Sequence, residues 1–517
     1  MGRHRLLSAW GALSAVLVIG CGDGRTPEME LGSVARAVSI QKSYPRKILV
    51  HMMPWFQVGG QHWSMKSRNP ATGIASWYAP MIGEYSSRDA VVIEYQLLLM
   101  KYAGIDGVLV DWPGLATAND LPQNKANADA IINGTATFGL EFGVVYEDQY
   151  AASVAAATND MAYVRDNFFS KPNHIKVNGV PAMLVFGPQK FLNAADWTTI
   201  LSPFPTNPAF FALWYNNAAG SNADGKFAWL APNALKGVSD FDSGLDGVNH
   251  GLMIPVLYPG FNTYYAQGGW PGPTYKISYT LKSDNTEGGD TFQSTFDLGK
   301  YAGEPLQIAT WNDYGEGTMI EPTTQFQYQF LTTLQQSVGA IYTDAELKIV
   351  KMLYDQRRQF GASKQMVLDQ ASAALANLDV AAACALLGCT PPVHTGSGAT
   401  TGSTGTATGT TGSGTIGSGG SSGSGSSTVG TNGSGGSPGT SGTTAGVGGS
   451  SASGGSNGTG QGGMGNAAGD KTDGPSGTSK GSCGCTVIGA DPTRAPALLL
   501  AGGALALASI RRRRRTA

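Results

Sequence analysis

Short, continuously apolar runs alternate with stretches of helical spacing between about residues 45 and 390. The runs lie at 47–55, 105–112, 142–147, 181–186, 209–215, 227–230, 253–258 and 306–311. Between the first two, residues 89–103 carry apolar side chains at helical spacing and end at Gly104, a typical helix C-cap. Strands that are apolar throughout and separated by helices predict a parallel sheet covered on both faces.

Eight such strands within about 300 residues predict a (β/α)8 TIM barrel, an α/β fold, over residues 45–390. The alternative is an open, doubly wound sheet. That fold usually carries a Gly-rich first turn, which is absent here.

Composition changes sharply after the predicted barrel. Glycine accounts for 73 of the 517 residues, and most of the excess lies at 391–480. This stretch consists mainly of Gly, Ser and Thr, so it cannot bury enough apolar surface to offset the entropy lost on ordering. We predict a disordered, low-complexity linker that holds the barrel away from a surface.

Both ends of the chain carry sequences typical of export and anchoring. Residues 1–21 have a basic start, an apolar core and small residues before Cys21, which predicts a signal peptide. The end of this segment resembles a bacterial lipobox, whose Cys is acylated; an ordinary signal peptide with an incidental Cys is the alternative. Residues 481–517 combine Cys483 and Cys485, an apolar segment at 495–510 and arginines at 511–515.

This C-terminal combination resembles the myxobacterial C-terminal sorting signal. A short transmembrane segment that acts as a plain membrane anchor is the alternative. Together the two ends predict an exported protein, located at the outer membrane and cell surface or outside the cell, with the membrane or the envelope-anchoring machinery as a partner.

Charge and cysteine content limit which ligands and partners the chain is expected to bind. A net charge of −2 gives no indication of nucleic-acid binding. The spacing of Cys and His suggests no zinc site, so we expect no metal and no cofactor. Cys384 and Cys389 could pair in an oxidising compartment or remain two buried thiols. We expect a monomer.

The predicted strand ends are rich in carboxylates and aromatic side chains. In a (β/α)8 barrel the active site lies at the C-terminal ends of the strands. Carboxylates suit acid/base chemistry at an acetal, and aromatic rings suit the apolar faces of sugars. A tryptophan or histidine here can also be core. We predict a carbohydrate site with these candidates: His51, Trp55, Asp111, Trp112, Glu147, Tyr150, Trp214, Tyr258, Trp311, Asn312, Asp313 and Glu316.

The most specific motif follows the eighth predicted strand. Residues 309–322 read Ala-Thr-Trp-Asn-Asp-Tyr-Gly-Glu-Gly-Thr-Met-Ile-Glu-Pro. They resemble the Asn-Glu-Trp-His-Glu-Gly-Thr-Gln-Ile-Glu-Pro signature of glycoside hydrolase family 99 and of the related family 71/99-like proteins. Weaker landmarks follow the family's order at Met53-Pro54-Trp55, Asp111-Trp112, Glu147-Asp148-Gln149-Tyr150 and Pro259-Gly260-Phe261.

The resemblance covers about residues 47–322. It implies a retaining, endo-acting α-glycosidase of the endo-α-mannosidase or mannanase kind, with a polysaccharide as substrate. Glu316 falls on the family's general acid/base and Glu321 within its substrate-binding signature. Asp313 falls on the carboxylate proposed to deprotonate the sugar's own 2-hydroxyl, which then attacks the anomeric carbon.

The sequence departs from the family signature at two places. Asp313 replaces a glutamate, which shortens the side chain by one methylene, and Tyr314-Gly315 replaces a Trp-His pair. A direct displacement and a different sugar therefore stay open. An endo-α-1,3-glucanase related to family 71 is one alternative. A non-catalytic surface protein that binds carbohydrate on the same scaffold is another, because a fold does not fix a function.

The linker prediction leads to a direct test. If 391–480 is disordered and dispensable, a chain ending at Pro392 should keep both its melting temperature and its activity. A clear drop in either would show that the tail packs on the barrel.

Overall fold

The computed structural model of the protein describes residues 41–214, 216–242, 252–300 and 305–394. The predicted signal peptide at 1–21, the linker beyond residue 394 and the sorting segment at 481–517 lie outside the described residues. No helix within the described residues is both long enough and apolar enough to span a membrane.

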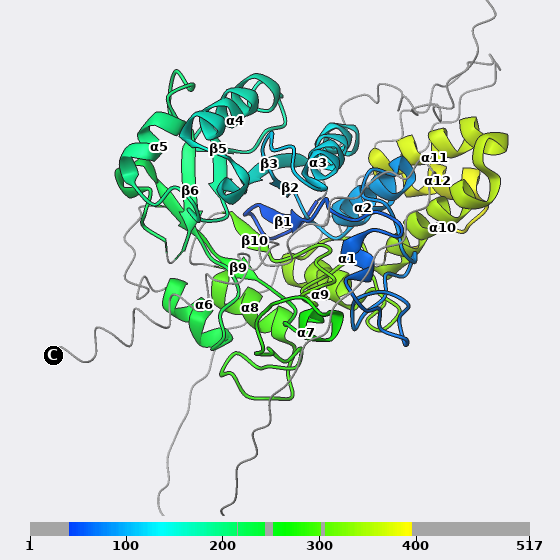
Figure 1. The fold of residues 1–517 in the computed structure, drawn as a ribbon. Coiled ribbons are helices and arrows are strands. Elements are labelled where there is room, and N and C mark those ends of the chain that lie inside the picture. Colours follow the sequence, from blue (N-terminus) through cyan, green and yellow to red (C-terminus); the bar gives the residue numbers. More distant parts are fainter. Residues whose placement is uncertain (1–40, 215, 243–251, 301–304, 395–517) are drawn as a thin grey trace, which may run out of the picture. The chain divides into compact units, whose positions relative to one another are not determined.

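Nine strands pair in parallel within the described residues, and they form one sheet that curls into a barrel (Figure 1). The order of pairing is β8-β7-β6-β5-β3-β2-β1-β10-β9. A short antiparallel strand, β4, pairs with β5 outside this path. The strands are β1 (Ile48–Met52), β2 (Gly107–Trp112), β3 (Glu141–Tyr146), β4 (Lys176–Val177), β5 (Val180–Val185), β6 (Ala209–Leu213), β7 (Gly225–Phe227), β8 (Leu252–Ile254), β9 (Val256–Leu257) and β10 (Leu306–Ile308).

The two ends of this path meet at Pro255. Strand β8 pairs with β7, and β9 pairs with β10, while only Pro255 separates β8 from β9 in the chain. Proline has no backbone N–H to give to a ladder, so the strand is interrupted there. Counting β8 and β9 as one strand gives eight parallel strands in a nearly closed ring. This confirms the predicted barrel over the open sheet.

All eight predicted strands are present, with shifted boundaries. The largest shift is in the sixth, predicted at 227–230 and found at Gly225–Phe227. The predicted helix at 89–103 is α2 (Ala90–Tyr102), whose N-terminus is capped by the Asp89 carboxylate accepting from the Val91 N–H at 2.9 Å.

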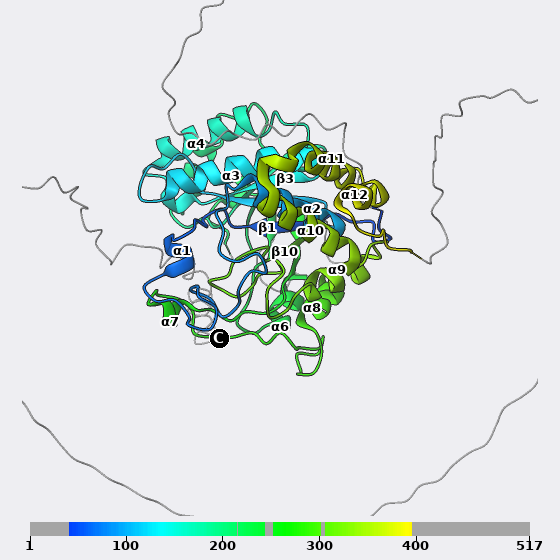
Figure 2. The ribbon, with the colours of Figure 1, turned by 90° about the vertical axis from the view of Figure 1, so that its right-hand side faces the viewer.

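Helices surround the barrel, and a further helical layer packs beside α2 (Figures 1 and 2). The last three helices of the described chain form this layer, in which Cys384 and Cys389 are joined as a disulfide. The helices are α1 (Gln61–Ser64), α2, α3 (Leu121–Thr135), α4 (Val154–Asn167), α5 (Ala194–Ile200), α6 (Leu235–Asp242), α7 (Tyr265–Gly268), α8 (Thr291–Gly299), α9 (Gln329–Val338), α10 (Asp344–Phe360), α11 (Gln365–Ala376) and α12 (Val380–Leu387).

Alternation along the strands separates two apolar cores. One face of β1 to β3 and of β5 to β8 points into the barrel and contributes to a cluster that includes Leu49, Leu109, Val145, Leu184 and Phe227. The other face packs on the helices. Because side chains alternate with period two, each inward core residue places the residue two positions later on the same inner wall, nearer the mouth.

A buried ion pair fixes α10 to α2. Arg357 donates to both oxygens of Glu94 at 2.7 Å and to Asp369 at 2.8 Å, and the side chains of Arg357 and Glu94 are each 3% exposed. Arg357→Leu leaves Glu94 buried without its partner, so we expect it to lower the free energy of unfolding by about 3–5 kcal/mol. Lys351→Ala breaks the exposed Lys351–Asp355 pair and should cost under about 1 kcal/mol. Equal melting temperatures for the two variants would contradict the expectation.

Candidate active site

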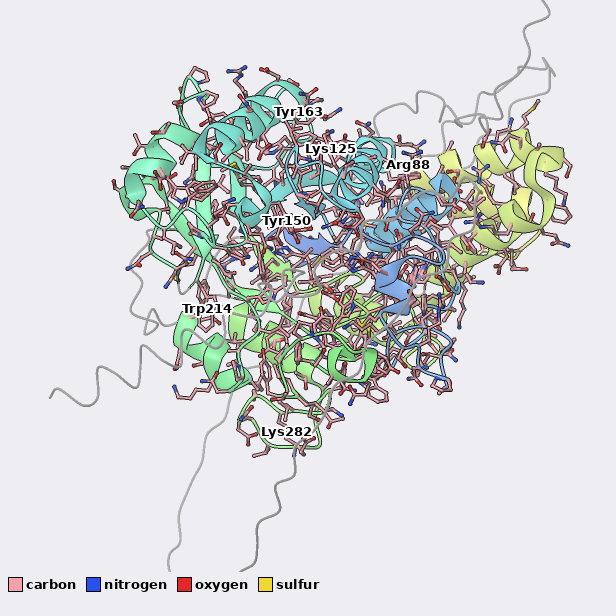
Figure 3. All side chains as sticks on the ribbon, viewed as in Figure 1. Arg88, Lys125, Tyr150, Tyr163, Trp214 and Lys282 are labelled. Carbon is pink, nitrogen blue, oxygen red and sulfur yellow. A yellow bond between two sulfur atoms is a disulfide. The ribbon has the colours of Figure 1, made fainter. Side chains whose placement is uncertain are left out.

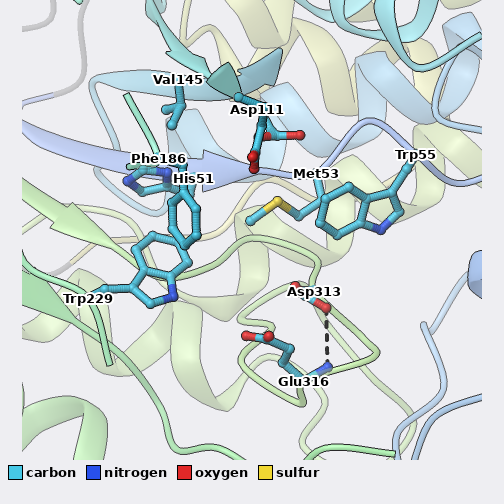
Figure 4. A pocket seen from close by; sticks show the side chains of 10 residues that line it. His51, Met53, Trp55, Asp111, Val145, Phe186, Trp229, Asp313 and Glu316 are labelled. Atoms are coloured by element: carbon cyan, nitrogen blue, oxygen red, sulfur yellow. Dashed lines mark hydrogen bonds between the residues drawn. The ribbon is translucent and has the colours of Figure 1, made fainter. Parts of the chain in front are cut away.

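A pocket opens where the parallel strands end at their C-terminal side (Figure 4). It encloses about 350 Å³, including space open to solvent at its mouth. Its walls combine carboxyl groups with aromatic and apolar side chains: His51, Met53, Trp55, Asp111, Val145, Glu147, Phe186, Trp229, Asp313 and Glu316.

Strand alternation explains why these side chains meet. Asp111 follows the inward Leu109 by two residues, and Glu147 follows the inward Val145 by two. Phe186 and Trp229 follow Leu184 and Phe227 in the same way. The pocket is therefore the continuation of the barrel interior, in which polar groups replace the apolar core at the mouth.

Asn312 ties the loop after β10 to the end of β1. Its side-chain oxygen accepts from the Met53 N–H at 2.8 Å, and its amide nitrogen donates to the Met53 carbonyl at 3.0 Å. The Trp311 N–H also donates to the His51 carbonyl at 2.7 Å. Asn312 is fully buried, so its amide positions the loop and does not face the pocket.

Glu321 fixes the far end of the same loop. Its carboxylate accepts from the hydroxyls of Tyr85 and Tyr314 at 2.8 and 2.9 Å and from the Gln96 amide at 2.7 Å. Burial raises the pKa of Glu321 to about 7, against the opposing effect of these hydrogen bonds. The structure places Glu321 behind the pocket, where it holds the loop and is out of reach of a ligand.

This anchored loop carries Asp313 and Glu316 into the pocket together. The Glu316 N–H donates to Asp313 Oδ1 at 3.2 Å, as drawn in Figure 4. Asp313 is 4% exposed and Glu316 is 6% exposed. The Tyr265 hydroxyl, from α7, lies 3.5 Å from Glu316 Oε1. The two carboxyl groups are thus held close to each other at the mouth of the barrel.

Asp313 and Glu316 lie in different surroundings, so their carboxyl groups are expected to have different pKa values. Burial and the nearby charge of Asp313 raise the pKa of Glu316 well above its usual range. Burial also raises the pKa of Asp313, to about 7, but backbone N–H groups of Glu316 and Gly315 oppose that rise by stabilising its charge. Asp313 is therefore expected to ionise first, while Glu316 keeps its proton.

Asp111 and Glu147 form a second carboxyl pair. In Figure 4 the Asp111 side chain faces Asp313 and Glu316. The two side chains interact directly, and Glu147 also accepts from the Gln149 amide at 2.8 Å. Burial raises the pKa of Asp111 to about 7, and the charge of Asp313 adds to this. Burial and the charge of Asp111 raise the pKa of Glu147 well above its usual range.

Aromatic rings form the remaining walls. His51 contacts Gln307 at 2.6 Å, and burial lowers the pKa of His51 to about 4, so the ring is neutral near pH 7. Trp229 meets the His51 ring edge-on at 4.8 Å between centroids. On the opposite side of the pocket in Figure 4, Trp55 stacks on the His62 ring at 4.9 Å.

Besides Asn312 and Glu321, five predicted site residues lie away from the pocket lining. Trp112 points to the outer face and stacks on Tyr163. Trp214, labelled in Figure 3, packs edge-on against Phe241 of α6. Tyr258 and Trp311 are fully buried core residues. Tyr150 is half-buried near Glu147 and Asp111, whose charges add to the burial that raises its pKa.

The sequence-based candidates omitted five side chains of the site. Met53, Val145, Phe186 and Trp229 line the pocket, and Tyr265 contacts Glu316 from outside the lining. The period-two rule applied from Leu184 and Phe227 would have found Phe186 and Trp229. No sequence signal points to Tyr265, since it reaches Glu316 only through the folding of the loop after β9.

Comparison with known proteins finds relatives that carry the name of endo-α-mannosidases. No protein-family model matches the chain. It is 20% identical over 310 residues to a human "Glycoprotein endo-alpha-1,2-mannosidase-like protein", covering 52% of this chain and 64% of that protein. It is 21% identical over 308 residues to a Xenopus laevis "Glycoprotein endo-alpha-1,2-mannosidase", covering 52% and 66%. The chain thus spans less than two thirds of the length of these relatives.

Solved structures align with this chain only at low similarity. The family 99 endo-alpha-mannosidase from Bacteroides thetaiotaomicron aligns with a TM-score of 0.43 and 16% identity, over 59% of this chain and 98% of that one. A "Glycoside hydrolase-like protein" aligns with a TM-score of 0.43 and 12% identity, over 59% and 97%. The sequence matches support the predicted homology to endo-α-mannosidases. The predicted C-terminal sorting signal lies outside the described residues.

Proposed function

We propose that this chain is a retaining glycoside hydrolase that cleaves internal α-glycosidic bonds of a polysaccharide. The observation that carries the proposal is the placement of Asp313 and Glu316, which one anchored loop brings together into a pocket walled by Trp55 and Trp229. Two adjacent carboxyl groups of different proton affinity beside aromatic rings are what hydrolysis of a sugar acetal requires. The sequence relatives support the same reaction class.

The different environments of the two carboxyl groups suggest their roles. Glu316, which keeps its proton, donates it to the departing glycosidic oxygen and later removes a proton from the attacking water. Asp313, ionised, accepts a proton from the sugar's 2-hydroxyl or attacks the anomeric carbon directly. His51 is neutral, so it forms no ion pair with the carboxylates. Its ring packs against Trp229 in the wall of the pocket.

The experiment is a screen of the purified full chain against α-mannans, α-glucans and bacterial exopolysaccharides. Internal cleavage predicts new reducing ends with a rapid fall in polymer length, and retention predicts that NMR detects the same anomer in product as in substrate. Best activity on an α-1,3-glucan would favour the glucanase alternative. Binding without any new reducing ends would favour the non-catalytic surface protein and overturn the proposal.

The pH dependence follows from the pair of carboxyl groups. Activity requires one proton shared between Asp313 and Glu316, so it should fall at high pH, when Glu316 loses its proton. It should also fall at low pH, when Asp313, whose pKa is raised to about 7, becomes protonated. We expect a bell-shaped profile of kcat/KM with its acidic limb near neutral pH. An activity that stays constant from pH 4 to pH 6 would contradict this ordering.

We also propose that the enzyme acts at the cell surface, on the sequence evidence of residues 1–21 and 481–517. Intact cells should then hydrolyse added polysaccharide, and external protease should remove that activity. Activity confined to the cytosolic fraction would contradict this location.

A further inference from the structure

The pocket contains twice the number of carboxyl groups that the proposed chemistry uses. Asp313 and Glu316 serve the reaction, while Asp111 and Glu147 face the same space from the ends of β2 and β3. Neither lysine nor arginine is among the described residues that line the pocket, and His51 is neutral there. Four carboxyl groups therefore share one small volume with no positive side chain to offset them.

Such a grouping of carboxyl groups is unfavourable by itself. A buried carboxylate is costly unless a cation or hydrogen-bond donors compensate it. Glu147 is 2% exposed, and its nearest polar partners are the Gln149 amide and the Asp111 carboxyl group itself. All four groups have raised pKa values, chiefly because of burial. A positively charged ligand would offset this penalty more fully than the hydroxyl groups of a neutral sugar, which donate hydrogen bonds but carry no charge.

A second observation concerns Glu316, on the wall opposite Asp111. Glu316 is only 6% exposed, and its side chain points into the pocket. The Tyr265 hydroxyl reaches only its Oε1, at 3.5 Å; no hydrogen bond from the described residues reaches its other oxygen. Nearby Trp55, Trp229 and Phe186 offer ring faces, which attract cations as well as sugar rings.

A metal ion fits this arrangement poorly. Within the described residues, no three His, Cys, Asp or Glu side chains converge so as to hold a metal ion. The carboxyl groups instead stand on opposed walls of the pocket, as Figure 4 shows for Asp111 against Asp313 and Glu316. A cation attached to a sugar ring suits this arrangement, because the reacting bond would lie at Glu316 on one wall while the charge faces Asp111 on the other.

We propose that the preferred substrate is an α-linked glycan whose sugars carry free amino groups, and that Asp111 and Glu147 bind the resulting ammonium. This inference rests on the proposed glycosidase function. It assigns the second carboxyl pair to substrate selection and leaves the bond cleavage to Asp313 and Glu316.

The experiment compares one polymer in two chemical forms. An α-1,4-linked galactosamine polymer is assayed before and after complete N-acetylation, with an α-mannan as the neutral reference. We expect kcat/KM for the free-amine form to exceed that for the N-acetylated form by at least about tenfold at low salt, and the ratio to fall as ionic strength rises. Asp111→Asn and Glu147→Gln should each bring the ratio towards one. Asp355→Asn removes the same charge from the exposed surface of α10 and should leave the ratio unchanged.

A binding measurement separates the two proposals. Calorimetry on the Glu316→Gln protein measures the affinity for short galactosamine oligosaccharides and for their N-acetylated forms without turnover. Tighter binding of the amines, with no cleavage of any polymer by the unaltered protein, would overturn the proposed hydrolase and keep the ammonium site. Equal or faster cleavage of the neutral or N-acetylated polymers, unaffected by Asp111→Asn, would overturn this inference and keep the hydrolase.

Discussion

Glu316→Gln should lower turnover on natural glycans by at least about 100-fold, because loss of a positioned acid/base removes rate factors of this size. Glutamine keeps the size of the side chain and can still contact Tyr265, so the fold should be unaffected. Glu287→Gln makes the same chemical change on an exposed loop and serves as the control for any general effect.

The leaving group gives this prediction its sharpest measurement. A glycoside whose leaving group is a weakly basic phenol needs little protonation as it departs. If Glu316 is the acid, its Gln variant should lose much less rate on such an aryl glycoside, in the step that releases the phenol, than on the polysaccharide. Equal losses on both substrates would mean that the substitution damaged binding, and near-full activity on the polysaccharide would remove Glu316 from the acid/base role.

The sequence predicts the barrel because the strands are apolar on both faces, a pattern that few other folds share. It predicts the pocket only in part. Neighbouring residues at a strand end look equally suitable in the sequence, although their side chains alternate between the pocket and the helices. This explains why Asp111 lines the pocket while its neighbour Trp112 packs on Tyr163.

Other parts of the site depend on contacts between distant segments. Glu321 accepts from Tyr85 and Gln96, which lie 236 and 225 residues earlier in the chain. Nothing local distinguishes such a structural carboxylate from one that faces a sugar. The family resemblance placed Glu321 with the substrate-binding residues, and the structure places it behind the loop that carries Asp313.

Asp313 occupies a position in which a structural and a catalytic role predict different results. Its Oδ1 accepts from the Glu316 N–H at 3.2 Å, which stabilises the turn between the two residues. The same side chain lines the pocket beside Glu316. Asparagine retains an oxygen that can accept this hydrogen bond but cannot act as a base. Alanine loses both properties, so the two substitutions separate the roles.

We expect Asp313→Asn to fold normally and to bind glycan, with turnover reduced at least about 100-fold. Asp313→Ala should show the same loss of turnover and, in addition, a decrease in stability of about 1 kcal/mol, the usual cost of losing a side-chain cap. Melting temperatures, binding affinities and kcat for both variants provide the test. If Asp313→Asn cleaves at a near-normal rate and only Asp313→Ala melts early, Asp313 merely caps its turn. The second carboxyl role would then pass to Asp111 or Glu147, which line the same pocket as Glu316.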